Sequence, residues 1–177
     1  SFIGSEGTNA YTSTDMTVYV EQIPSNQIKN WARIQADRFA NPVIRGFHTE
    51  LETVYEEKNM SLTKDFRKAL EAMDGMLFPD HPYGTQTVLG TQEHLKNPSI
   101  TNIKNYQKTY YVPNNIAICL SGDFDPDEMV TVIEKYFGQM QPNKDLPEIT
   151  LATSSVIESP VEKDVYGLDA ENIMIGW

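Results

Sequence analysis

The most specific fold signal lies in residues 110–138, which read YYVPNNIAICLSGDFDPDEMVTVIEKYFG. Within it, the apolar run at 115–121 predicts a strand that is covered on both faces. Asp125 is a candidate N-cap, followed by proline at the first helical position and by Glu128 three residues after the cap, which is a typical helix start. Gly138 ends the predicted helix.

On either side of this region the chain alternates between extended and helical patterns. β-branched and aromatic residues predict an extended stretch over residues 9–21. Apolar residues at helical spacing predict helices after Ser25 (as N-cap), over 49–60, from Leu62 to Leu77 and after Ser99. The sequence PDHPYG at 79–84 predicts a loop, and residues 172–177 a short apolar strand. Helices and strands in this order indicate an α+β fold.

The composition limits the classes of partner. The chain of 177 residues has 14 basic and 25 acidic residues and a net charge of −11. Nucleic acid is therefore not expected as a partner, because phosphate binding needs a basic face. The charge attracts cationic peptides at long range, or serves only solubility. The longest apolar run, 116–120, is too short to span a membrane. We expect a soluble protein, with the bacterial periplasm as a working guess for its compartment. Cys119, in the middle of the predicted strand, is expected to pack in the core.

One predicted helix carries a candidate metal ligand. Glu50, Val54 and Glu57 are spaced i, i+4, i+7, so both carboxylates project from one face, about 10 Å apart along the axis. Glu56 is the rival ligand and points about 100° away from that face. A helix rich in glutamate is also typical of a solvated surface, so the spacing alone leaves the metal hypothesis open.

Four stretches carry a resemblance to a known family. They are Gly7–Ser13, the helix with Glu50 and Glu57, His81–Gly84 together with Val88–Glu93, and Tyr110–Gly138. Together they resemble the pitrilysin/insulinase family of zinc metallopeptidases over roughly residues 4 to 140. The resemblance implies the later part of a metallohydrolase domain like those of pitrilysin and the mitochondrial processing peptidase. Helices would then pack on a largely antiparallel sheet.

The resemblance also implies roles for individual residues. Glu57 matches the glutamate that ligates zinc, and Glu50 matches a supporting acidic residue next to the metal. Asn9, Ala10 and Tyr11 match the edge strand along which an extended peptide substrate lies, held by main-chain hydrogen bonds. Zinc in the complete parent protein would lower the pKa of a bound water, and a carboxylate base would complete its activation.

The chain also departs from the family pattern. The chain contains no H-x-x-E-H motif, which in the family supplies two histidine ligands and the catalytic glutamate, and its histidines, His48, His81 and His94, are isolated. We therefore expect the chain to be inactive by itself and to hold no zinc alone. Its expected partners are a missing N-terminal segment and a second homologous domain or partner subunit. The expected organisation is an incomplete first domain at 1–140, a linker at 141–171, and the start of the following domain at 172–177.

Two other functions fit the same residues. The family fold also occurs in catalytically silent subunits that act as scaffolds or partners of an active homologue. A simple peptide-binding module would use the edge strand alone and would need no metal. The sequence that precedes Ser1 in the gene decides between enzyme and silent subunit, because only an enzyme needs the H-x-x-E-H helix.

Overall fold

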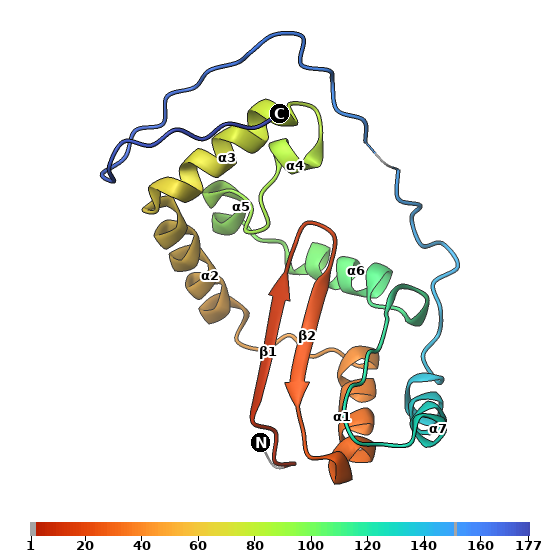
Figure 1. The fold of residues 1–177 in the computed structure, drawn as a ribbon. Coiled ribbons are helices and arrows are strands. Elements are labelled where there is room, and N and C mark those ends of the chain that lie inside the picture. The colour runs from red at the N-terminus through yellow and green to blue at the C-terminus, as the bar shows by residue number, and fades with distance from the viewer. Residues whose placement is uncertain (1–2, 151) are drawn as a thin grey trace. The chain divides into compact units, whose positions relative to one another are not determined.

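The computed structural model describes residues 3–150 and 152–177, and within them it confirms the α+β class (Figure 1). The two strands are β1 (Gly7–Thr12) and β2 (Thr17–Gln22). The α-helices are α1 (Ile28–Ala40), α2 (Phe47–Leu62), α3 (Asp65–Leu77), α4 (Pro82–Thr85), α5 (Gln92–Lys96), α6 (Ile100–Tyr110) and α7 (Pro126–Phe137). Short 3-10 turns occur at Ser25–Gln27 and Pro113–Asn115. None of these helices has the length and apolar character that a bilayer crossing requires.

The elements form two compact units. The first contains β1 and β2, α1, and the region from Ser99 to Glu148 with α6 and α7. The second contains the hairpin turn Ser13–Met16, helices α2 to α5 within Gly46–Pro98, and the chain after Ile149. Each candidate site described below lies within one of these units.

The predicted extended stretch at 9–21 folds back on itself as a β-hairpin. β1 and β2 pair antiparallel, with Gly7 opposite Gln22 and Thr12 opposite Thr17. The N–H of Ser13 donates to the carbonyl of Met16 at 2.8 Å and closes the turn. The interpretation of 9–21 as one extended stretch thus missed a turn, because its Ser, Thr and Asp residues form turns as readily as they occupy strands.

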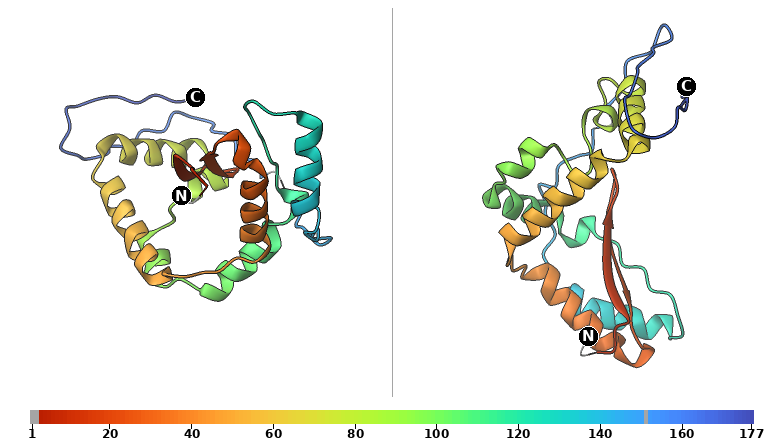
Figure 2. Two further views of the ribbon diagram at one scale, coloured as in Figure 1. Left: turned by 90° about the horizontal axis from the view of Figure 1, so that it is seen from below. Right: turned by 90° about the vertical axis from the view of Figure 1, so that its left-hand side faces the viewer.

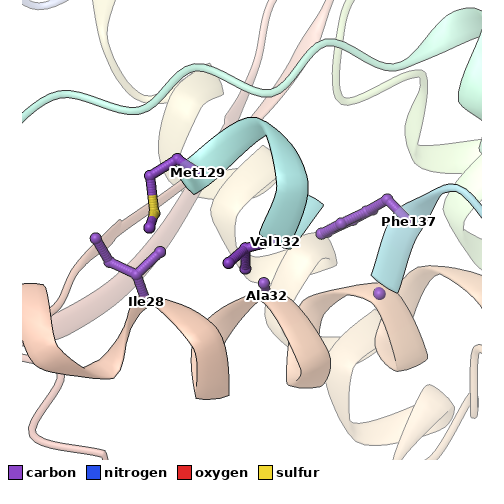
Figure 3. Close-up of a cluster of buried hydrophobic side chains, with 6 residues drawn as sticks. Ile28, Ala32, Met129, Val132 and Phe137 are labelled. Atoms are coloured by element: carbon purple, nitrogen blue, oxygen red, sulfur yellow. The ribbon is translucent and has the colours of Figure 1, made fainter. Parts of the chain in front are cut away.

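The core of the first unit lies between α1 and α7. One face of α1 presents apolar residues at i, i+4 and i+8, as the sequence predicted, and the helices lie side by side (Figures 1 and 2). Figure 3 shows α1 residues facing α7 residues across this contact. The buried members are Ile28, Ala32 and Ala36 from α1 with Met129, Val132 and Phe137 from α7. Ala32 is completely buried, which allows the two backbones to approach closely.

The other face of α1 contacts β2 through polar and aromatic groups. The ring of Tyr19 packs edge-on against Phe39, and its hydroxyl lies 3.1 Å from that of Tyr111. Burial, together with this hydrogen bond, raises the pKa of Tyr111 to about 12. The side-chain amide of Gln35 donates to a carboxylate oxygen of Glu21 at 2.7 Å. These contacts fix the hairpin on α1.

Of the two N-caps that the sequence predicts, the structure confirms Asp125 and not Ser25, and it shows a further cap at Ser99. The side chain of Ser99 accepts from the N–H of Asn102 at the start of α6. The side chain of Asp125 accepts from the N–H of Glu128 at 2.9 Å, with proline at the first position of α7. Ser25 makes no capping hydrogen bond. It begins a 3-10 turn that precedes α1, so its predicted N-cap role is wrong.

Replacing Asp125 with alanine removes a cap from one of the two core helices. We expect the free energy of unfolding to fall by about 1 kcal/mol, the typical value of an N-cap carboxylate. Denaturant unfolding followed by circular dichroism measures the change. Asp123→Ala is the matched control, because Asp123 is exposed and has no hydrogen bond among the described residues. Equal losses in both variants would show that the cap contributes nothing of its own.

The strand predicted at 115–121 is not formed among the described residues. The segment is extended, with Ile116 at φ −124° and ψ 136°, but no described strand pairs with it. Ile118 is 37 % exposed, and Cys119 is also exposed, so its predicted core position is wrong. Leu120 alone packs against the α1–α7 core. A strand needs a neighbour to satisfy its backbone groups, and an apolar run cannot by itself provide one.

The sequence at 81–84 also differs from the prediction, because it forms most of a short helix rather than a loop. Pro82 occupies the first position of α4, where a missing N–H costs nothing, and His81 Nδ1 accepts from the N–H of Tyr83 at 3.1 Å. Gly84 is required here, since a Cβ atom would collide with the carbonyl oxygens of Phe78 and Asp74. Proline and glycine here start and tighten a helical turn.

The chain after Gly138 has no regular element in its described part, so the strand predicted at 172–177 is not formed. Its part from Ile149 onward belongs to the second unit, where it is attached to α3. The Asp65 carboxylate, at the start of α3, accepts from the N–H groups of Leu168 and Asp169 and from Lys68 Nζ. These hydrogen bonds, that of Lys68 first, hold the pKa of Asp65 below its usual value. Gly176 lies against Leu77 near the other end of α3.

This attachment predicts that the Asp65 carboxylate protects the backbone amides of Leu168 and Asp169 from hydrogen exchange. In Asp65→Ala we expect the amides of Leu168 and Asp169 to lose their acceptor and to exchange with solvent at least about tenfold faster. Hydrogen–deuterium exchange read by mass spectrometry measures the rates. Asp74→Ala, elsewhere on α3, should leave them unchanged. Identical exchange in wild type and Asp65→Ala would contradict the attachment.

Candidate functional site

Glu50 and Glu57 both lie on the exposed side of α2, and their carboxylates make no hydrogen bond or ion pair with any residue that the structure describes. Seven residues turn a helix by about 700°, so the two side chains leave the axis within about 20° of each other. The predicted helix and its shared face are therefore present. Because neither carboxylate is engaged elsewhere, each is available as a ligand.

Glu56 is exposed on the same helix but points in another direction. It lies about 100° around the axis from Glu57, in the middle of the solvent-facing side. Glu57 instead borders the half-buried face, next to Val54 and Lys58. Exposure alone does not distinguish the two.

A buried lysine that the sequence analysis missed lies next to Glu57. Lys58 is only 5 % exposed. Its Nζ lies 3.4 Å from Oε1 of Glu71 on α3 and 3.5 Å from Oγ1 of Thr87. The next residue, Asn59, accepts from Gln92 of α5 at 2.7 Å.

A sequence signal for this lysine exists. Lys58 lies in the apolar stripe of α2, at a position where helical spacing predicts a hydrophobic residue. The stripe is Leu51, Val54, Tyr55, Lys58 and Leu62. A charged residue in such a stripe is usually paired, as Lys58 is here.

The described residues contain no complete metal site, since no three His, Cys, Asp or Glu side chains among them converge. Two of the histidines have structural roles. His81 Nδ1 caps α4, and His94 Nδ1 accepts from the N–H of Thr91 at 3.5 Å in the capping box of α5. His48 stacks edge-on against Phe47 at the start of α2. Glu57 can thus supply one ligand, and any imidazole ligands must come from outside these residues.

β1 has a free edge in the described structure, because it pairs only with β2. Hydrogen-bonded and non-hydrogen-bonded pairs alternate along an antiparallel ladder. Since Ser13 donates to Met16, the ladder bonds fall at Tyr11 and Asn9, and the backbone groups of Ala10 point away from β2. The N–H of Ala10 is in fact engaged by the side-chain oxygen of Asn9, at 2.9 Å.

One face of this hairpin is hollowed. The hollow has a volume of about 380 Å³ and is lined by Glu6, which precedes β1, and by alternate residues of the two strands, namely Gly7, Asn9, Tyr11, Val20 and Gln22. Tyr11 and Val20 supply large exposed apolar groups there. An extended chain added at the β1 edge would place every second side chain on this face. Asn9, Ala10 and Tyr11 thus share one edge, while Glu50 and Glu57 belong to the other unit.

Comparison with known proteins gives consistent results. Residues 99–177 match the family model described as the peptidase M16 inactive domain. The chain is 28 % identical to a probable mitochondrial-processing peptidase subunit beta of Schizosaccharomyces pombe over 138 residues, and 29 % identical to an uncharacterized zinc protease of Mycobacterium leprae over 133. These alignments cover 76 % and 73 % of the chain, but only 30 % and 29 % of the relatives. The chain thus spans less than a third of their length.

Solved structures share the fold. A protease from Helicobacter pylori matches with a TM-score of 0.73 and 21 % identity, over 87 % of this chain and 36 % of its own. The first half of the periplasmic protease PqqL from Escherichia coli matches with a TM-score of 0.74 and 19 % identity, over 84 % of this chain and 33 % of its own. At this level of identity the likeness establishes the fold.

Proposed function

We propose that the chain, as a member of the peptidase M16 family of pitrilysin-type metallopeptidases, is part of a zinc-dependent metalloendopeptidase that cleaves extended peptides. The observation that carries the proposal is the pair of unengaged carboxylates, Glu50 and Glu57, on one face of α2. The chain has no H-x-x-E-H motif, so we propose that it is inactive unless that helix is supplied.

In this proposal Glu57 donates one carboxylate ligand and Glu50 restricts its position. An anionic oxygen together with two neutral imidazoles is a ligand set that suits zinc and leaves a position for water. Zinc, when bound, would lower the pKa of that water towards neutrality. The proposal agrees with the absence of any partner for Glu57 among the described residues, since an engaged carboxylate would first have to be released.

The free edge of β1 is the proposed docking strand for the substrate. A peptide that adds as a strand would hydrogen-bond to the backbone of Ala10, after the side chain of Asn9 releases its N–H. Alternate peptide side chains would then face the hollow beside Tyr11. The net charge of −11 favours cationic peptides in the encounter.

Proline at position 10 tests this edge. Ala10→Pro removes an N–H that points away from β2, so the hairpin keeps its ladder while the edge loses a donor. We expect the Kd for a fluorescent cationic peptide to rise about tenfold, the equivalent of one net hydrogen bond of about 1.4 kcal/mol. Fluorescence anisotropy measures the affinity, with and without chelator, because a simple peptide-binding module would need no metal.

The matched control is Ala170→Pro, the same exchange at an exposed site in the chain after α7. Peptide binding that survives Ala10→Pro unchanged would remove β1 from the docking site. Equal weakening in both variants would point to a general effect of proline.

The alternative is a catalytically silent member of the family that serves as scaffold or partner subunit of an active homologue. The match of residues 99–177 to the inactive-domain model keeps this alternative open. Sequencing the gene upstream of Ser1 and measuring zinc by mass spectrometry in the intact protein test the choice. An intact H-x-x-E-H helix with one bound zinc supports the enzyme, and a helix without its histidines supports the silent subunit.

A further inference from the structure

We propose that Lys58 is a positioning residue that fixes the rotation of α2, so that Glu57 rather than Glu56 occupies the ligand position. This inference rests on the proposed function, because it concerns the same α2 face. The inference starts from the burial of the Lys58 side chain, which zinc binding does not itself require.

Among the described residues, the ion pair of Lys58 is one of two polar side-chain connections from α2 to other helices and loops. Lys58 Nζ reaches Glu71 of α3 at 3.4 Å, and the Thr87 hydroxyl at 3.5 Å. One residue further, Asn59 accepts from Gln92 of α5 at 2.7 Å. The two connections leave the helix in directions about 100° apart, so together they resist rotation about its axis.

Rotation matters because the rival carboxylates are adjacent in sequence. A turn of α2 by one residue, about 100°, would bring Glu56 to the place that Glu57 holds and would move Glu50 out of line with it. Apolar contacts alone resist such a turn weakly, because side chains of similar volume can exchange places in a core. A buried ammonium is less exchangeable, since another buried place without an acidic partner would leave its charge unpaired.

The pair adds little to stability by comparison. Replacing a buried ion pair with apolar groups of similar size is often neutral or stabilising. A lysine at this position is therefore better explained by orientation than by stability. Experiments can separate these two roles. Loss of orientation changes metal affinity and the rotation of the helix, while loss of stability changes the unfolding temperature.

The first arm of the test measures Zn²⁺ affinity of the intact protein by competition with a chromophoric chelator. We expect Lys58→Met to weaken it about 10- to 100-fold, the usual effect of losing a group that orients a ligand. Glu71→Gln should act similarly, the double variant should be no worse than either, and Lys58→Arg should restore affinity. Lys104→Met, which removes an exposed helical lysine, is the matched control. Unchanged affinity in Lys58→Met, or a loss that only parallels a lower Tm of the zinc-free protein, would overturn the proposal.

The second arm needs no metal and uses the chain itself. In a Cys119→Ser background, a nitroxide at position 57 and another at Lys96 on α5 report the orientation of α2 by their distance distribution. We expect Lys58→Met to broaden or shift the distribution, and Lys58→Arg to preserve it. An unchanged distribution would refute the positioning role. If wild-type intact protein binds no zinc while this arm succeeds, the proposed function fails and the rotational role of Lys58 stands by itself.

Discussion

Glu57→Gln is expected to weaken zinc binding by the intact protein more than about 100-fold, because losing a ligand costs more than the 10- to 100-fold typical of a supporting group, and to abolish peptide hydrolysis with it. Glutamine keeps the shape of the side chain but replaces an anionic oxygen with a neutral amide, which is a poor zinc ligand. The exposed location of Glu57 means that the exchange breaks no hydrogen bond or ion pair among the described residues. The fold should therefore be unaffected. Zinc competition and cleavage of a quenched fluorescent peptide measure the two effects.

Glu56→Gln is the control for this prediction, because it removes the same charge from the neighbouring exposed position of the same helix. It should change affinity and hydrolysis less than about threefold, the effect of one distant surface charge. Glu50→Gln should fall between the two, in the range of about 10- to 100-fold that a supporting group contributes. If Glu56→Gln is the variant that loses zinc, the register of the ligand assignment is wrong by one residue.

Phe137→Ala is expected to destabilise the first unit by about 3–5 kcal/mol, the usual cost of emptying a buried aromatic site. Phe137 is 8 % exposed, and its ring centre lies 6.5 Å from that of Trp31. The α1–α7 core has only six buried members among the described residues, so a single cavity removes much of it. Since total stabilities are about 5–15 kcal/mol, the loss is large. Denaturant unfolding followed by tryptophan fluorescence measures it.

Val130→Ala provides the comparison on the same helix. Val130 is 64 % exposed, so its truncation should change stability by less than about 0.5 kcal/mol. If Phe137→Ala prevents folding altogether, Phe137→Leu gives the graded value, expected near 1.5 kcal/mol. Similar losses at positions 130 and 137 would contradict the position of the core.

Elements coded by neighbouring residues were predicted well. α7 has its cap, its proline and its closing glycine within fourteen residues, and the structure confirms each of them. The face of α1 was predicted for the same reason. The structure also confirms that Glu50 and Glu57 share one face of α2, because this depends only on helical spacing.

Features that depend on distant residues were not predictable in this way. Whether residues 115–121 form a strand depends on a neighbouring strand, and Cys119 is exposed because none of the described strands provides one. The burial of Lys58 depends on Glu71 and Thr87, which are 13 and 29 residues away. A charged residue is expected at the surface unless its partner is known, and spacing within α2 does not reveal that partner.

The segment at 116–120 pairs with no described strand, which has a practical consequence for the isolated chain. Its backbone can pair with the same segment of a second molecule, and the exposed thiol of Cys119 could then join the two copies covalently in air. Gel filtration at rising concentration should show a dimer that dithiothreitol reduces in amount. Storage in reductant at low concentration, or a Cys119→Ser version, would keep the preparation homogeneous for every measurement proposed above.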